Sequence, residues 1–447
     1  MANTYLTRTF GAETNRKIWT WSAWVKRQNL VSDHQNALFA VYENTSNRSV
    51  FRFNAHQLNF QDTGNSVEIK TNRLFRDTSA WYHIVVRVDT TQATASDRVR
   101  IYVNGEQETS FATATYPNQN ANMMFNNSFV HFINARQDGS IDSIADMSYS
   151  HIHFTDGTAY DATAFGEYDA NGVWTIKTSP SVTYGTNGFF ILKDGNSVTD
   201  QSGNSNNFTV AGGTLTNTED SPSNVFATLN PLRNFSSMGS FSNGNNTYTK
   251  GNDGWVSALS TLGITSGKYY YEAKWVSGSY LKIGFCTDNG VSAIGHISET
   301  NLPGGYAWYT HDNGHVKTDN AVVSGWNYTD IPNITSISTG DIMKIAVDLD
   351  NKYAYFGVND VWAKTNADPT SGASGTGGLD ISSDFPSGTI LFPAISVYNS
   401  VANVNFGNGY FGTTAVASAG TNASGNGIFE FDVPTGYTAL STKGLNL

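Results

Sequence analysis

The stretch HIVVRVDTTQATASDRVRIYVNGEQ, which begins at His83, constrains the fold of this chain more than any other. Branched apolar residues occupy every second position in it twice, first at Ile84, Val86 and Val88 and again at Val99, Ile101 and Val103. A period of two places each apolar set on one face of an extended strand. Asn104-Gly105 follows, and this dipeptide is typical of a tight hairpin because both central residues of the turn need positive φ. The stretch predicts a hairpin-like core element of a sheet, with its charged side chains in solvent.

The same alternation recurs along most of the 447 residues, in short segments separated by Gly, Asn, Ser and Thr. The 42 glycines and the 13% of aromatic residues fit this pattern, since small polar residues make turns and aromatic side chains fill sheets. A chain of this length exceeds one typical core. We therefore predict an all-β protein with two antiparallel, jelly-roll-like β-sandwich domains in tandem and a small C-terminal segment.

Shifts in composition set the expected domain boundaries. Strand-like segments fill residues 1–215, and the polar stretch at 216–239 predicts a linker. A second set of strand-like segments fills residues 240–412. Residues 413–447 are small and polar until a final strand and turn, which we expect to pack on a domain or on a neighbour.

Charge and hydropathy exclude several classes of partner. The net charge is −11 and only 14% of the residues are charged, whereas nucleic-acid binding needs clustered Lys and Arg. No apolar run approaches ~18 residues, so we expect no insertion into a membrane. The N-terminal MANTYLTRTF also lacks the apolar core of a secretory signal. Cys286 is the sole cysteine, and its position in a predicted strand favours a small buried apolar side chain.

Longer segments carry a family resemblance. TRTFGAETNRKIWTWSAWVKR, SAWYHIVVRVDTTQATASDRVRIYVNGEQ and IADMSYSHIHFTDGTAYDATAFGEYDANGVW resemble the concanavalin A-like, laminin G-like domain of bacteriophage structural proteins. SGKYYYEAKWVSG, YLKIGFCTDNG, GYAWYTHDNG, GDIMKIAVDLDNKYAYFGVND and LFPAISVYN resemble a SPRY domain. Chains that join both modules to a segment like FDVPTGYTALST are similar to virion proteins of phages that infect marine bacteria.

The resemblance implies a place on the surface of the phage particle, after synthesis in the cytoplasm of the host bacterium. The favoured function is that of a non-enzymatic tail fibre or appendage that binds the host cell surface, with a glycan or receptor as its partner. The first alternative is a decoration or cement protein of the capsid or tail that binds other virion subunits. In either case we expect a homo-oligomer, and trimers are common among such appendages.

A polysaccharide depolymerase is the second alternative, because the concanavalin A-like fold also hosts glycoside hydrolases. Such enzymes need two carboxylates flanking the sugar bond, and those of this fold carry them as alternating acids on one strand. The first domain contains no such run. Glu430 and Asp432 alternate, as do Asp348 and Asp350, but the second pair sits at a turn where aspartates commonly accept from backbone amides. We therefore expect no enzyme activity and name no catalytic residue.

Two loop regions of the second domain are the best candidates for ligand binding. In SPRY domains the recognition surface is formed by loops at one end of the sandwich, and aromatic faces beside amides and carboxylates suit sugar rings. We expect Tyr306 and Trp308 to point into the core, and Tyr309, His311 and Trp326 to be exposed. The candidate ligand-binding residues are Tyr309, His311, Asp312, Asn313, Trp326 and Tyr328.

Metal ligands are less well indicated. His151 and His153 alternate on one strand face, which suits either a metal pair or two imidazoles on the polar face of a strand. Loop aspartates and amides suit Ca²⁺, whose preferred ligands are oxygen atoms. Asp194, Asn196 and Asp200 are therefore candidate calcium ligands, although such residues are also common in turns. We expect no other cofactor.

Overall fold

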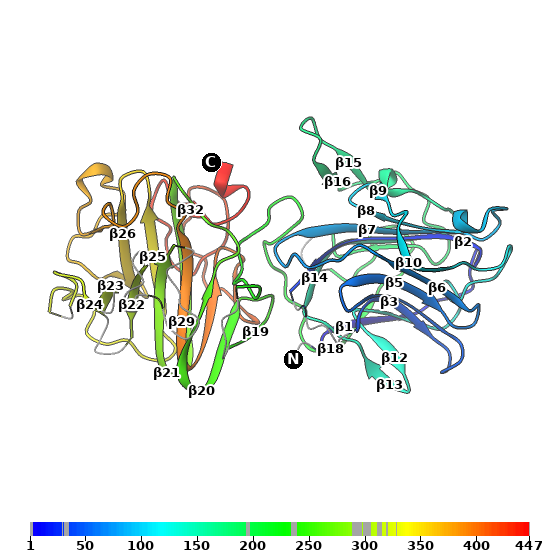
Figure 1. The fold of residues 1–447 in the computed structure, drawn as a ribbon, viewed down its shortest axis with the longest axis horizontal. Coiled ribbons are helices and arrows are strands. Elements are labelled where there is room, and N and C mark those ends of the chain that lie inside the picture. The colour runs from blue at the N-terminus through cyan, green and yellow to red at the C-terminus, as the bar shows by residue number, and fades with distance from the viewer. Residues whose placement is uncertain are drawn as a thin grey trace. The chain divides into compact units, whose positions relative to one another are not determined.

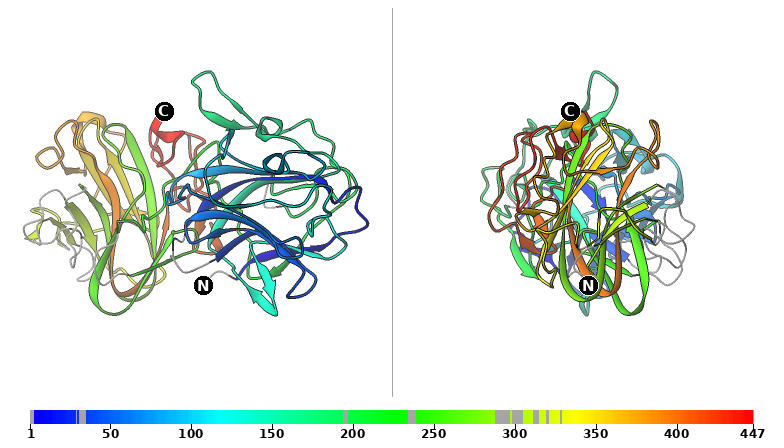
Figure 2. Two further views of the ribbon diagram at one scale, coloured as in Figure 1. Left: turned by 45° about the vertical axis from the view of Figure 1, so that its right-hand side comes forward. Right: turned by 90° about the vertical axis from the view of Figure 1, so that its left-hand side faces the viewer.

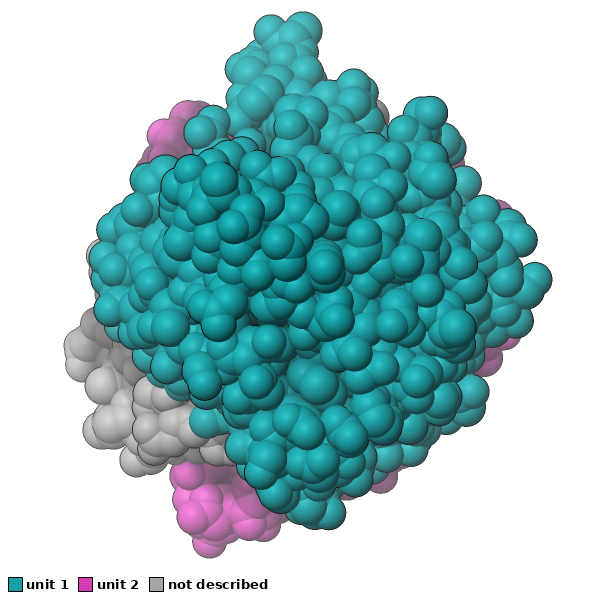
Figure 3. All heavy atoms as spheres, turned by 90° about the vertical axis from the view of Figure 1, so that its right-hand side faces the viewer, with its two compact units in different colours: residues 1–217 teal, residues 218–447 magenta. Residues whose placement is uncertain are grey.

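The computed structural model describes residues 3–28, 30, 35–193, 197–233, 239–287, 297, 305–310, 315–318, 321–327 and 329–446. The chain divides into two compact units, residues 1–217 and 218–447 (Figure 3). Strands dominate both units, as two further views show (Figure 2). The helical elements among these residues are single 3-10 turns, η1 (Ala95–Asp97), η2 (Ala162–Ala164), η4 (Gly372–Ser374) and η5 (Gly444–Asn446). No helix in this part of the chain is long and apolar enough to cross a membrane. The protein is all-β, as predicted.

The first unit is built from two large antiparallel sheets (Figure 1). The eight-stranded sheet has the order β10 (Phe111–Thr115), β6 (Val67–Thr71), β5 (Gln57–Asp62), β4 (Arg48–Asn54), β3 (Gln35–Tyr42), β11 (Val130–Ile133), β1 (Tyr5–Thr9), β18 (Thr209–Gly212). The six-stranded sheet has the order β17 (Phe189–Ile191), β14 (Met147–Asp156), β2 (Ile18–Arg27), β7 (Trp81–Asp89), β8 (Val99–Val103), β9 (Glu106–Gln107). Residues from both sheets share one buried apolar cluster, which makes the unit a β-sandwich.

The opening stretch of the sequence forms β7, β8 and β9 of the six-stranded sheet. Ile84 pairs with Val103 and Val88 with Val99, and all four side chains are buried in the core, as the alternation predicts. Asn104 and the glycine after it have φ values of 49° and 86°, as the predicted turn between β8 and β9 requires.

Residues 157–187 cover part of the outer face of the six-stranded sheet, because Phe165 from this segment packs on Val85 and Tyr102. The segment contains the hairpin β15 (Gly166–Tyr168) and β16 (Trp174–Ile176), which projects from the unit in Figure 1. A smaller hairpin, β12 (Arg136–Asp138) and β13 (Ser140–Asp142), lies beside β3. Side chains that alternation alone assigns to solvent are therefore partly buried in the first unit.

The second unit has one continuous twelve-stranded sheet. One path through it is β19 (Ser240–Ser242), β20 (Thr247–Leu259), β29 (Phe392–Asn405), β21 (Lys268–Cys286), β22 (Gly305–Tyr309), β23 (His315–Thr318), β24 (Ala321–Val322). A branch of the sheet starts at β21, which pairs with β25 (Ile342–Asp348). β25 pairs in turn with β26 (Tyr353–Val358), and β26 pairs with β27 (Val361–Trp362) and β28 (Leu379–Asp380). On its other side, β21 pairs with β32 (Thr438–Ala439). The remaining pair is β30 (Tyr410–Phe411) and β31 (Thr414–Ala415).

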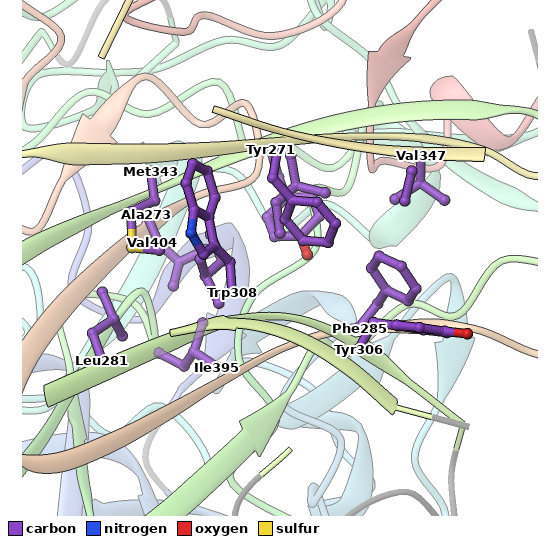
Figure 4. Close-up of a cluster of buried hydrophobic side chains, with 14 of the residues drawn as sticks. Tyr271, Ala273, Leu281, Phe285, Tyr306, Trp308, Met343, Val347, Ile395 and Val404 are labelled. Atoms are coloured by element: carbon purple, nitrogen blue, oxygen red, sulfur yellow. The ribbon is translucent and has the colours of Figure 1, made fainter. Parts of the chain in front are cut away.

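Long strands allow this one sheet to fold into two layers. The first half of β21 pairs with β25 and its second half pairs with β22, while β29 pairs with residues 272–286 on the other side. The register shifts after Trp275, and Gly278 has a φ of 104° where a Cβ atom would lie 2.1 Å from the Asn399 carbonyl oxygen. Only glycine fits so close an approach at positive φ. Figure 4 shows the resulting core, in which Tyr271 and Met343 lie opposite Trp308 and Ile395.

The C-terminal segment packs on the outer face of β21, β25 and β26. Phe429, Val433 and Tyr437 share a buried cluster there with Tyr270 and Tyr355. The carboxylate of Glu272 joins the two parts, since it accepts from the backbone N–H of Glu430 and of Phe431, each at 3.0 Å. Burial raises the pKa of Glu272 to about 7. Residues 413–447 are thus an integral layer of the second unit.

The expected linker at 216–239 differs from what the structure shows. The second unit begins at Thr218, and Phe226, Ala227 and Leu229 are buried in its core. Ala227 is held by a backbone hydrogen bond to Leu440. These residues form a short apolar run that fills the sandwich. The linker was predicted because the residues around this run are polar.

Candidate functional site

Four aromatic side chains gather on the outer face of the layer formed by β20, β29, β21 and β22. Alternation produces this face: Leu281 and Ile283 of β21 point into the core, so Tyr280 and Lys282 point away from it. By the same rule the other three strands present Trp255 from β20, Tyr398 from β29 and Tyr309 from β22. We call Trp255, Tyr280, Tyr309, Tyr398 and Lys282 the aromatic cluster.

Strand register places these side chains next to one another. Tyr398 is the direct cross-strand neighbour of both Trp255 and Tyr280, and Lys282 is the neighbour of Tyr309. The Trp255 ring centroid lies 5.6 Å from that of Tyr398 and 5.6 Å from that of Tyr309. The Tyr280 centroid lies 5.7 Å from Tyr398 and 5.8 Å from Tyr309. Each of the four residues is partly exposed, and their rings lie next to one another on this face.

Lys282 lies at the base of the aromatic cluster. Its side chain is buried, and its ammonium nitrogen lies 5.0 Å from the Trp255 ring centroid and 5.1 Å from that of Tyr309. At these distances the positive charge is attracted to both ring faces. Lys282 therefore contacts two rings that come from different strands, and its ammonium nitrogen also lies 3.5 Å from the Ile297 carbonyl oxygen.

The sequence-predicted residues of the second unit divide into three groups. Tyr306 and Trp308 point into the core as predicted, and Tyr309 is partly exposed in the aromatic cluster. Trp326 does not fit the prediction: it is 4% exposed and packs edge-on against Phe356 at 5.7 Å. The turn after β24 returns its ring to the core, which the local sequence does not reveal. His311, Asp312, Asn313 and Tyr328 lie outside the described residues.

The prediction from sequence did not include four members of the aromatic cluster, although their positions carry a usable signal. These members are Trp255, Tyr280, Lys282 and Tyr398. Each occupies the non-core position of an alternating strand, and three of the four are aromatic. A search confined to loops overlooks such positions.

The carboxylates considered for catalysis serve as acceptors for backbone amides. Glu430 accepts from the backbone N–H of Ala417 at 3.0 Å, and Asp432 accepts from that of Thr421 at 2.6 Å. Asp348 is 1% exposed and binds the Lys268 ammonium at 2.9 Å. These contacts are those of turn anchors, as predicted for the pair at 348–350.

The candidate calcium ligand that the structure describes has a similar role. The two carboxylate oxygens of Asp200 accept from the backbone N–H groups of Phe190, Ser202 and Asn206 and from the Ser202 hydroxyl, at 2.7–2.9 Å. Donors in these four positions leave no room for a cation ligated by the carboxylate. Asp194 and Asn196 lie outside the described residues, within which no group of three metal-ligating side chains occurs.

The paired histidines of β14 are buried as well. His151 has a φ of 49° at a register shift of β14, and the two ring centroids are 6.5 Å apart. His153 stacks on Phe190 at 4.0 Å and its Nδ1 is 3.0 Å from the Tyr184 hydroxyl. Burial holds the pKa of His153 well below its ordinary value. The face of β14 that we expected to be polar is instead a second packed layer.

His83 departs from the prediction of a solvated face for the same reason. It is fully buried, stacked on Trp24 at 4.9 Å, and its Nδ1 accepts from the indole N–H of Trp174 at 3.0 Å. Burial lowers the pKa of His83 to about 3. The second layer on the six-stranded sheet is therefore assembled around imidazoles in their neutral form.

Comparisons with known proteins give one family match and several similar solved structures. Residues 2–148 match the family model described as the concanavalin A-like lectin/glucanases superfamily. Among solved structures, the chain is similar to the SPRY domain of human HERC1, at 16% identity and a TM-score of 0.25, over 36% of this chain and 87% of that one. It is also similar to the TRIM65 PSpry domain, at 9% identity and a TM-score of 0.28, over 40% and 87%. No curated protein matches the chain. The first unit thus contains a domain similar to concanavalin A-like lectins and glucanases, in a chain whose solved neighbours include SPRY domains.

Proposed function

We propose that the chain is a non-enzymatic binding protein of a bacteriophage particle, a tail fibre or appendage that holds host-surface glycan on the aromatic cluster. The observation that supports this most is the set of four partly exposed rings on one sheet face. Sugar rings present C–H patches that pack on such rings, and hydroxyl groups at their rim that bind the tyrosine hydroxyls. The resemblance of the joined modules and closing segment to phage virion proteins supports the place on the particle.

Replacing Trp255 with alanine is expected to weaken glycan binding roughly 5- to 30-fold, because one stacked ring contributes about 1–2 kcal/mol. The measurement is binding of the full chain to purified envelope polysaccharides of susceptible host bacteria, immobilised on a sensor surface. Trp362→Ala is the matched control, since Trp362 is also partly exposed and has the Lys344 ammonium 4.6 Å from its ring. Equal loss in both variants, or none in either, contradicts the assignment.

Two further readouts separate the other functions. Release of reducing ends from a bound polysaccharide would identify a depolymerase and overturn the non-enzymatic assignment. Gold labelling of intact particles in the electron microscope tests the location: signal at the tail agrees with an appendage, and even signal over the head indicates a decoration protein. Particles without signal contradict a virion role altogether.

A further inference from the structure

We propose that two copies of the chain associate through β10, antiparallel to each other, so that their eight-stranded sheets become continuous across a two-fold axis. Within the part of the chain that the structure describes, β10 has a strand on one side only, namely β6. Along the free side of β10, every second residue points its backbone N–H and C=O groups outward. Another extended strand can pair with this row of groups. The partner that this edge fits is thus a β-strand.

β10 lacks charge and proline, two of the features that usually prevent such pairing, and its one irregularity is a register shift between Phe111 and Thr113, after which residues 113–115 pair regularly with β6. Its sequence is FATAT, without charge or proline, and Ala112, Ala114 and Thr115 are exposed. Soluble proteins usually protect exposed edges with lysine, proline or a covering segment. Phe111 at its start packs partly on the core, so pairing would also shield the rim of the sandwich.

The other sheet of the same unit shows what a protected edge looks like in this protein. At β17 the backbone N–H of Phe190 donates to the Asp200 carboxylate at 2.8 Å, and the Phe190 carbonyl accepts from the backbone N–H of Gln201 at 2.7 Å. The opposite edge strand, β9, has two residues, of which Glu106 is charged. Unlike β17 and β9, β10 is open and uncharged. We therefore infer that its free edge binds a partner.

A second copy is the occupant that the strand itself favours. Antiparallel pairing of β10 with its own copy places Thr and Ala side chains opposite one another, and these are small enough to meet without a clash. Such a two-fold contact closes on itself. The opposite edge strand of this sheet, β18, is a weaker partner because it is four residues long and ends at Gly212, where a strand is poorly stabilised.

Sedimentation velocity of the full chain tests this inference. We expect a dimer in the concentration range up to about 100 µM, since so small an interface belongs to the weak class. Ala114→Lys should weaken dimerisation at least tenfold, because a lysine on an edge strand blocks strand addition. Ala112→Lys is a second variant at an exposed position of the same strand. Calorimetry should show unchanged unfolding temperatures for both.

Val210→Lys on β18 is the matched control, because Val210 is an apolar residue, 38% exposed, on the other edge of the same sheet. It should leave the dimer intact. A wild-type chain that stays monomeric at about 100 µM overturns the inference. So does a dimer that both β10 variants leave unchanged. Dissociation by Val210→Lys to the same extent would indicate pairing of β10 with β18 and overturn the two-fold arrangement.

Discussion

Lowering the pH from 7 to 5 is expected to destabilise the first unit by about 4 kcal/mol through His83 and His131, with His153 acting in the same direction, because these three histidines of its interior are neutral in the fold. His83, His131 and His153 are each at most 1% exposed. Burial lowers the pKa of His83 and of His131 to about 3, and that of His153 well below 6.5. Between pH 6.5 and about 3 the unfolded chain binds a proton at His83 and at His131 and the fold does not. The free energy of unfolding therefore falls as the pH falls, by about 2 kcal/mol for each of these two histidines at pH 5, and His153 contributes in the same direction.

The contacts of these rings leave no place for the added proton. Nδ1 of His83 accepts the indole N–H of Trp174, and Nε2 of His131 accepts the backbone N–H of Asn126. The His131 ring also stacks on Phe10 at 3.6 Å. Protonation of either nitrogen would set two N–H groups against each other in a buried site. Low pH is thus expected to disrupt both the layer that residues 157–187 form on the six-stranded sheet and the core of the first unit.

The second unit is expected to respond to pH in the opposite direction. The pKa of Glu272 is raised by burial to about 7, above the ordinary value near 4.5, so the fold binds a proton there that the unfolded chain does not. Protonation between pH 7 and 4.5 stabilises this unit, by about 2 kcal/mol at pH 5.

Calorimetric scans of the full chain at pH 7, 6 and 5 measure both effects as two transitions that move apart. His153→Phe keeps a ring against Phe190 and removes one of the three titrating groups, so it should reduce the pH slope of the first transition. A first transition that does not move between pH 7 and 5 would contradict the neutral interior.

Trp308→Ala is expected to destabilise the second unit by about 3–5 kcal/mol, the usual loss when a fully buried tryptophan is truncated. Trp308 is 0% exposed and packs edge-on against Phe356 at 5.8 Å. Its neighbour in the chain, Tyr309, lies on the other face of β22 in the aromatic cluster. The loss should lower the unfolding temperature of the second unit by about 10 °C.

Trp255→Ala supplies the comparison, because the same substitution there removes a partly exposed ring. We expect a change in stability below about 1 kcal/mol for this variant and the loss of glycan binding described above. If the effects are reversed, with Trp255→Ala unfolding the unit and Trp308→Ala leaving it stable, the assignment of the two faces of this layer is wrong.

Alternation in the sequence identifies the sheets and their core faces well. It placed Trp308 and Tyr306 in the core and residues 83–105 in paired strands, because each strand buries one face whatever it pairs with. It does not show what covers the second face. His83 and His153 are buried by residues 157–187, and Tyr270 by the C-terminal segment, and both coverings depend on contacts between distant parts of the chain.

The candidate site escaped the sequence for a related reason. Its five side chains come from four strands that are brought together only by the order and register of the sheet. Tyr309 was selected because it adjoins a loop that the SPRY resemblance makes part of the recognition surface. Trp255 and Tyr398 are almost 150 residues apart in the chain and became neighbours only through pairing of β20 with β29.

The most direct test of the glycan-binding account is a crystal structure of the full chain with an oligosaccharide prepared from a polysaccharide that it retains. We predict a sugar ring in van der Waals contact with Trp255 and with at least one of Tyr309 and Tyr398. A bound sugar on any other surface of the chain, with these three rings uncovered, would contradict the account.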